Sequence, residues 1–472
     1  MTVRRKPGAQ PKAARVAMDK APPPALSREE RVAAGKALRD AVPRESHGVW
    51  KTPPKRRDPV AILIDSSRGR LPDLVPIRYG RMSRSPFTFL RGSAALMASD
   101  LAATPTTGLR VQACGDCHLL NFGMFATPER NLVFDINDFD ETLPAPWEWD
   151  VKRLAASFVV AARDRKLVEK DARAAAMACV RAYREAIRRY SQMSPLEVWY
   201  DRADMASILA AAPDAKARKF RQQIASKAQR RIGEYLFPKI VDQVGGRHRL
   251  IDQPPTLFHR NDADADRLAQ EASSGYRMSL ADDRRVLFDR YRLEDLAIKV
   301  VGIGSVGTRC YVGLFFSADG HSLLLQFKEA GVSVLEPYAG RSAFENHGQR
   351  VVVGQRLMQS SSDIFLGWTR SLRGFDFFGR QLRDMKMSFP VEGFTNVQLV
   401  RYAEGCGATL ARAHAKSGDP AMIGAYLGKT DVFDRAIGDF AMAYADQNER
   451  DYAELAAAID AGRIDALIED EQ

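Results

Sequence analysis

The stretch Gly115-Asp116-Cys117-His118-Leu119-Leu120-Asn121, followed by Asn137-Asp138-Phe139-Asp140, gathers carboxylate and amide oxygens in two short loops. Each loop follows a segment with the composition of a β-strand, residues 109–113 and 131–136. A glycine directly before Asp116 lets the chain turn sharply, so that both loops can face one cavity. The alternative is that these Asp and Asn residues only cap turns, which is their commonest role.

Oxygen-bearing side chains in this pattern suit a site that holds magnesium and orients a hydroxyl group. Mg²⁺ takes oxygen ligands and leaves room for phosphates and water. We expect Asn121, Asp138 and Asp140 to supply the metal ligands, with Asp135 as an alternative. Asp116 is expected to accept the proton of the hydroxyl group that is phosphorylated.

A second pattern, Gly302-Ile303-Gly304-Ser305-Val306-Gly307, has the spacing G-x-G-x-x-G. In a dinucleotide-binding fold a helix follows the last glycine. Here residues 308–316 are rich in β-formers, 317–321 carry a turn signal, and 322–328 are again apolar and extended. The glycines are therefore predicted to connect two strands. We expect Gly302, Gly304, Ser305 and Gly307 to cover the phosphates of a bound nucleotide.

Lys328 ends the strand that follows and is predicted to contact the α- and β-phosphates. Glu345 is the acid expected to pair with it, with Glu329 and Glu336 as weaker candidates. Glu345 has a second possible role, because Ser342 could begin a helix and form a capping box with it. Lys328 could equally be a strand-end lysine whose amine reaches water.

Several phrases of the chain resemble the bacterial family named domain of unknown function 2252, and the resemblance spans most of residues 60–460. These phrases are Ser85-Pro86-Phe87, Arg91-Gly92, Gly115-Asp116-Cys117-His118, residues 134–141 and residues 302–309. The family name implies no activity.

The separate motifs are similar to those of the aminoglycoside and choline kinase group within the protein-kinase-like superfamily, whose catalytic loop reads H-G-D-x-H-x-x-N. By this resemblance Asp116 matches the base, Asn121 and Asp138 the metal ligands, and His118 the histidine that orders the loop. Cys114 stands where the first histidine would be. Asp150 resembles an acidic position that follows the metal loop, although a helix cap also explains it.

The order of the motifs differs from that of ordinary kinases, because the glycine motif and Lys328 follow the catalytic loop. The resemblance therefore implies an α+β, protein-kinase-like fold of two lobes that is circularly permuted. The expected division is a basic, largely disordered tail (1–58), a helical lobe with both loops (59–250), a bridging segment (251–293), a β-rich nucleotide lobe (294–390) and C-terminal helices that pack on the helical lobe (391–472).

Local patterns predict the elements of these lobes. Apolar periodicity predicts helices over 87–101, 151–166, 170–191, 215–234, 396–417 and 432–459. Residues 364–368 and 375–378 could complete a five-stranded sheet, which would place 381–385 near the adenine. His414 is expected to pack or cap a helix rather than to act in catalysis.

Charge is distributed unevenly along the 472 residues. The net charge is +11, and residues 1–58 carry 15 Lys and Arg against 6 Asp and Glu. The basic character therefore belongs mainly to this segment, and only weak contact of the tail with nucleic acid is expected. The start of the chain lacks the apolar run of a secretion signal, and no stretch approaches the length of a membrane span, so a cytoplasmic location is expected.

The function expected from these patterns is an ATP- and Mg²⁺-dependent phosphotransferase that acts on a hydroxyl of an unidentified acceptor. AMP transfer to the acceptor is also open. One alternative is a nucleotide-binding regulator without activity. Another follows from Cys114-Gly115-Asp116-Cys117-His118, which satisfies the C-x-x-C-H pattern of haem attachment and the spacing of a redox dithiol. The two cysteines are otherwise expected to be packing residues in a tight loop.

Overall fold

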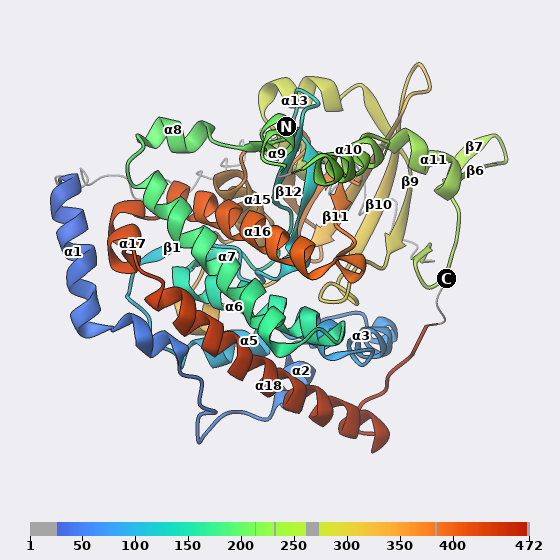
Figure 1. The fold of residues 1–472 in the computed structure, drawn as a ribbon. Helices are drawn as coiled ribbons and strands as arrows, with labels where there is room; N and C mark the ends of the chain where they lie inside the picture. Colours follow the sequence, from blue (N-terminus) through green and yellow to red (C-terminus); the bar gives the residue numbers. More distant parts are fainter. Residues whose placement is uncertain (1–25, 213, 231–232, 261–272, 383–384, 470–472) are drawn as a thin grey trace, which may run out of the picture.

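The computed structural model describes residues 26–469 apart from 213, 231–232, 261–272 and 383–384 (Figure 1). It combines a large helical body with a separate six-stranded sheet, so the mixed α+β class is confirmed. Within these ranges every helix is too short or too polar to traverse a lipid bilayer.

Four long helices form the centre of the helical body: α6 (Trp147–Asp164), α7 (Glu169–Tyr190), α16 (Asn396–Ser417) and α18 (Val432–Asp460). The last two lie beside the first two although more than 200 residues separate the pairs (Figure 1). Helix α7 buries a row of small side chains, including Ala172, Ala176 and Cys179, which lets α16 approach closely. The bounds match the predicted helices to within a few residues.

The segment before the first loop is helical. It contains α1 (Arg28–Ala41), η1 (Arg44–Gly48), α2 (Pro59–Asp65), η2 (Pro72–Leu74), α3 (Val75–Met82), α4 (Pro86–Gly92) and α5 (Ala94–Leu101). The predicted disordered tail therefore needs correction: α1 begins with a Ser27–Glu30 capping box and packs on α17 (Pro420–Leu427). Residues 1–25 lie outside the described residues. The single helix expected over 87–101 is interrupted at Ser93.

The two predicted strands beside the acidic loops exist but pair with other partners. β1 (Arg110–Ala113) pairs with β4 (Leu143–Pro146), and a turn of 3₁₀ helix, η3 (Leu119–Asn121), follows. β3 (Leu132–Ile136) pairs with β2 (Phe122–Ala126) in a sheet of order β14-β2-β3-β5, whose outer strands are β14 (Met387–Ser388) and β5 (Ala203–Asp204). Both acidic loops therefore emerge at strand ends.

The six-stranded sheet has the order β12-β13-β11-β10-β9-β8. Its strands are β8 (Leu257–Phe258), β9 (Tyr291–Lys299), β10 (Cys310–Ser317), β11 (Ser322–Glu329), β12 (Gly367–Arg370) and β13 (Asp376–Gln381). β10 pairs antiparallel with both β9 and β11, so the glycine motif connects two strands, as predicted.

Part of the predicted bridging segment belongs to this sheet. β8 adds a sixth strand to the five that were expected, and Phe288 of α13 (Asp282–Phe288) packs against Phe315 of β10. Residues 261–272 of the same segment lie outside the described residues. Where it is described, the bridging segment is therefore a structural part of the six-stranded sheet and its packing.

The remaining elements pack around the helical body and the sheet. They are α8 (Pro195–Tyr200), α9 (Met205–Ala210), α10 (Ala215–Gln229), α11 (Gly233–Ile240), β6 (Val241–Val244), β7 (Arg247–Leu250), α14 (Glu336–Ala339), α15 (His347–Met358) and η4 (Val391–Gly393). Of these, α15 contacts both β12–β13 and α16. The predicted capping of the helix after residue 341 is wrong. α15 begins with Asn346 as its cap, and its side chain accepts a hydrogen bond from Gln349 N.

The close approach of α16 and α7 gives a test of this packing. A Cβ atom at Gly407 would overlap the backbone carbonyl of Cys179, whereas one at Gly405 would lie 3.7 Å from the Phe134 ring, an ordinary contact. We expect Gly407→Ala to lower the free energy of unfolding by about 2 kcal/mol or more, because the helices must separate. Gly405→Ala should be neutral or slightly stabilising. Urea unfolding of both variants checks this, and equal values would contradict the described helix contact.

Candidate active site

The acidic loops and the glycine loop, which are far apart in the sequence, line one cleft of about 520 Å³. The predicted site residues among its lining are Asp116, His118, Asn121, Asp138, Asp140, Gly302, Gly304 and Ser305. Most of the predicted site is therefore brought together in space. This volume is within the range of small-molecule sites.

Asp140 joins the two halves of the cleft. Its Oδ2 lies 2.5 Å from Lys328 Nζ and accepts a hydrogen bond of 3.1 Å from Ser305 Oγ. Its Oδ1 is buried and has no hydrogen-bond partner among the described residues. Burial lowers the pKa of Lys328, but Asp140 and Asp138 outweigh this effect, and the net pKa is raised. Lys328 is therefore charged, and Asp140 keeps one oxygen available for a cation.

The predicted pairing of Lys328 with Glu345 is wrong. Glu345 is exposed and lies just before α15, where its backbone carbonyl accepts a hydrogen bond from Arg370. Asp140, in the second acidic loop, pairs with Lys328 instead. The other two candidates are also committed elsewhere: Glu329 pairs with Arg309, and Glu336 accepts a hydrogen bond from Ser333 N.

Asp138 and Asn121 complete the oxygen-rich side of the cleft. Burial raises the pKa of Asp138, but Lys328, Arg380 and Lys386 overcome this and hold it well below the usual range. Asp138 is therefore ionised. The Asn121 amide nitrogen donates to the backbone carbonyl of Asp116 at 2.6 Å, which leaves its amide oxygen for a ligand. Two carboxylates and one amide oxygen are a donor set that fits Mg²⁺.

Asp135, the alternative metal ligand, is held away from this set. It is fully buried, pairs with Arg412 of α16, and accepts hydrogen bonds of 2.8 Å from both Ser360 N and Ser360 Oγ. Its role is to connect β3 to α16. Of the three carboxylates, Asp138 and Asp140 line the cleft and Asp135 does not.

Asp116 is held by an arginine that the sequence analysis missed. Arg153 of α6 donates through Nε to Asp116 Oδ1 at 2.7 Å, and its Nη2 contacts the same oxygen. The other carboxylate oxygen lies 4.0 Å from His118 Nε2. Burial lowers the pKa of His118 to about 4, with Asp116 opposing and Arg91 and Arg153 adding to the effect. His118 is therefore neutral at pH 7 and lies beside Asp116.

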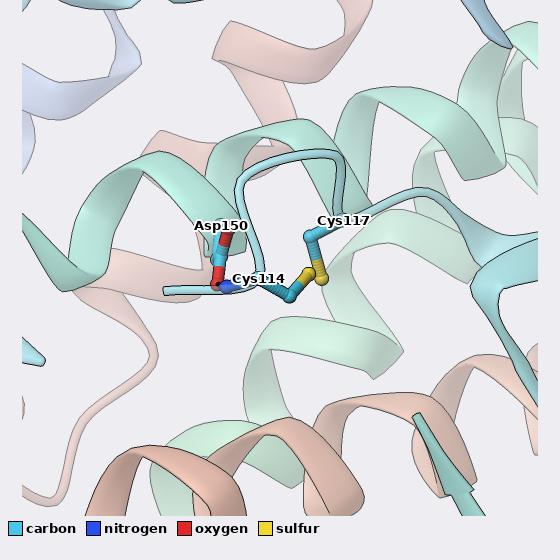
Figure 2. Close-up of side chains that lie close together, drawn as sticks. All are labelled: Cys114, Cys117 and Asp150. Atoms are coloured by element: carbon cyan, nitrogen blue, oxygen red, sulfur yellow. Dashed lines mark hydrogen bonds between the residues drawn. The ribbon is translucent and has the colours of Figure 1, made fainter. Parts of the chain in front are cut away.

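Asp150 in the first turn of α6 orders the start of the loop 114–121, where it lies beside Cys114 (Figure 2). Its carboxylate accepts hydrogen bonds from Cys114 N at 2.7 Å and Gly115 N at 3.0 Å, and His414 Nε2 lies 3.3 Å away. Asp150 is not the helix cap, because Pro146 occupies that position. Gly115 has a φ of +83°, a conformation that glycine adopts without strain.

The two cysteines of the loop point toward each other, with their sulfur atoms adjacent (Figure 2). Among the His, Cys, Asp and Glu side chains of the described residues, Cys114, Cys117 and Asp150 are the three whose potential ligand atoms lie close enough together to hold one ion. Burial raises the pKa of Cys117 to about 12 and that of Cys114 well above its usual value, so both are protonated thiols. Metal and haem chemistry need thiolates or accessible thiols, and the cysteines are instead part of the hydrophobic core.

Arginines line the opposite side of the cleft and hold the glycine loop. Arg70 Nη1 donates to the carbonyls of Gly304 at 2.7 Å and Val306 at 2.6 Å, and Leu71 N donates to Gly307 O. Gly302 and Gly307 have positive φ angles of +64° and +85°. The Gly302 carbonyl accepts a hydrogen bond of 2.7 Å from Arg81 Nη1 of α3, so residues of the segment 70–81 hold the carbonyls of this loop.

Arg91 and Arg78 also line the cleft. The Arg91 guanidinium makes no hydrogen bond or ion pair with another described residue, although its charge interacts with Asp116. Of these arginines the sequence analysis named only Arg91, in the stretch Arg91-Gly92. The cleft is therefore lined by arginines as well as by carboxylates.

The fold and the cleft define a class: an α+β protein with a metal-suited acidic site beneath a glycine loop. The chain belongs to the family described as uncharacterized protein conserved in bacteria (DUF2252), whose model matches residues 70–458. No curated protein and no solved structure matches the chain.

A double-mutant cycle tests the junction at Asp140. Lys328→Met, Asp140→Asn and the double variant are compared with the unmodified protein by urea unfolding without added metal. We expect a coupling energy of about 2 kcal/mol, because Lys328 is buried and the loss of either partner leaves a charge uncompensated. The exposed pair Arg435–Asp431 serves as control and should couple by less than about 1 kcal/mol. Equal coupling in both pairs would mean that the two halves are not joined here.

Proposed function

We propose that the protein is an ATP- and Mg²⁺-dependent phosphotransferase that phosphorylates a hydroxyl group of an acceptor. The observation that carries this proposal is the shared cleft, in which Ser305 of the glycine loop and Lys328 both contact Asp140 of the acidic loop. Phosphoryl transfer depends mainly on positioning and charge stabilisation, and these are what the cleft residues can supply.

The glycine loop and Lys328 would bind the nucleotide phosphates. The backbone N–H groups of Gly302, Gly304 and Ser305 donate no hydrogen bond to another described residue, so they are free for phosphate oxygens. Backbone N–H groups in such loops form anion-binding sites. Asn121, Asp138 and Asp140 would hold Mg²⁺, which neutralises phosphate charge when bound.

Asp116 would act as the base toward the acceptor hydroxyl. Arg153 occupies one of its carboxylate oxygens and fixes its orientation, while the side chain is 21% exposed to the cleft. A positioned carboxylate accepts the proton as the hydroxyl oxygen attacks the phosphorus. Neutral His118 beside it adds no positive charge that would weaken the base.

The order of the parts supports a circularly permuted relationship to kinases. The base and metal ligands precede the glycine loop and lysine in this chain, yet both acidic loops and residues 302–305 line one cleft. Lys328 and Gly307 do not line it, but Lys328 contacts Asp140 from behind the cleft surface. We infer that the six-stranded sheet serves as the nucleotide lobe and the helical body as the acceptor lobe. A cytoplasmic location, where ATP is abundant, is part of the same proposal.

A nucleotide-binding regulator without transfer activity is the second candidate. It is favoured by the Arg153–Asp116 pair, because Arg153 donates to one of the two Asp116 carboxylate oxygens and so occupies it. The two are distinguished by products: a phosphotransferase releases ADP with an acceptor, AMP transfer releases pyrophosphate, and a regulator releases neither.

The proposal predicts that ATP binding depends on Mg²⁺. We expect ATP to stabilise the protein in a thermal-shift titration only when Mg²⁺ is present. Asp138→Asn should raise the apparent dissociation constant of Mg²⁺–ATP by at least about tenfold, because even indirect metal contacts have effects of this size. Asp319→Asn, in an exposed turn of the same sheet, is the control. Unchanged magnesium dependence in the variant would reassign the ligand to Asp140, and no nucleotide effect in any condition would refute the function.

The second prediction separates binding from turnover. Asp116→Asn should lower ADP release by about 100-fold or more, measured with water or an added hydroxyl compound as acceptor. The variant should bind Mg²⁺–ATP nearly as well as the unmodified protein, because Asp116 acts on the acceptor. Weakened nucleotide binding with unchanged residual turnover would contradict the assigned role.

A further inference from the structure

A second cavity, of about 460 Å³, lies among α7, α9, α10 and α16 against one face of β2 and β3. It shares no lining residue with the acidic cleft. Its volume is in the range that small-molecule sites occupy in proteins. The proposed phosphotransferase chemistry does not use it.

Most of the lining of this cavity is apolar. Aromatic rings of Phe134, Phe389 and Tyr402 contact one another, with centroids 5.2–5.9 Å apart, and Phe220 and Phe394 extend this wall. Met205, Ile208 and Ile224 add aliphatic surface. A ligand that fills this space must therefore have an apolar body.

Positive charge accompanies this apolar lining. Among the described lining residues there is one acid, Asp201, and five arginines: Arg189, Arg202, Arg221, Arg401 and Arg412. Asp201 accepts a hydrogen bond from the hydroxyl group of Tyr190. Arg401 is partly buried and forms no ion pair with a described residue, although Arg221 carries a like charge close by. An uncompensated pair of like charges beside an apolar cavity favours an anion.

Arg412 is the most informative of the five. It is only 3% exposed, and it pairs with Asp135 through Nη2. Its Nη1 is buried without any hydrogen-bond partner among the described residues. Buried donors of this kind are rare in folded proteins and indicate an unfilled hydrogen-bonding role. A polar atom of a bound ligand could accept from this nitrogen.

We propose that this cavity binds a small amphipathic anion, a carboxylate with an aliphatic or aromatic body, whose head contacts Arg401. The body packs against the rings of Phe134, Phe389 and Tyr402. The proposal is independent of the phosphotransferase function, because no nucleotide or metal residue lines the cavity.

The experiment compares matched anionic and neutral probes on the full chain. Decanoate and 1-decanol share their alkyl body, and each is titrated below its aggregation limit as a competitor of the fluorescent anion 8-anilinonaphthalene-1-sulfonate. We expect decanoate to bind about tenfold more tightly than decanol, the effect of one charge-assisted hydrogen bond. Equal affinity of the two probes would overturn the proposal, as would failure of decanoate to compete.

Variants place the binding in this cavity. Ala408→Phe, on the lining of α16, should weaken decanoate binding by about tenfold or more because it fills the space. Arg401→Gln should reduce the preference for decanoate over decanol, and Arg401→Lys should largely retain it. Arg463→Gln is the control, because Arg463 is exposed and its substitution removes the same single positive charge as Arg401→Gln. These variants avoid Arg412, whose loss would leave buried Asp135 unpaired. Unchanged decanoate binding in Ala408→Phe would assign the probe to another surface.

Discussion

The cleft depends on one oxygen, Asp140 Oδ2, which accepts hydrogen bonds from both Lys328 and Ser305. Lys328 is almost fully buried at the end of a strand, where an unpaired ammonium would be costly. The carboxylate that compensates it comes from the other half of the chain. The sheet therefore cannot be displaced from the acidic loops without exposing or isolating this charge.

Buried charges support the catalytic loop in the same way. Asp150 accepts hydrogen bonds from two backbone N–H groups of the loop. Arg153, one helical turn later, donates to the Asp116 carboxylate. Both side chains come from α6, whose other residues are packed in the core. A helix of the core thus holds the loop at both Cys114–Gly115 and Asp116. Loops that are supported by regular elements in this way hold their side chains with little freedom.

The sequence predicted what is local and left unresolved what depends on distant partners. Helices with clear apolar periodicity, such as 396–417, were placed to the residue, and the glycine motif was correctly assigned between strands. The pairing of Lys328 was wrong, because Glu345 is near in sequence but the true partner lies 188 residues away. Arg70 and Arg153 were missed for the same reason: an arginine gives no sequence signal of the carbonyl or carboxylate that it will meet in the fold.

The hydrogen bonds from Arg70 and Leu71 affect how the glycine loop could bind an anion. In a loop that moves freely, both the carbonyl and the N–H groups must be reoriented when phosphate binds, and the loss of conformational freedom opposes binding. Here Arg70 already holds the carbonyls of Gly304 and Val306, and Leu71 N holds that of Gly307. The ordering is therefore complete before any ligand arrives. A loop that is ordered in advance binds a fixed anion geometry with less entropic cost, so the segment around Arg70 is as much a part of the site as the glycines themselves.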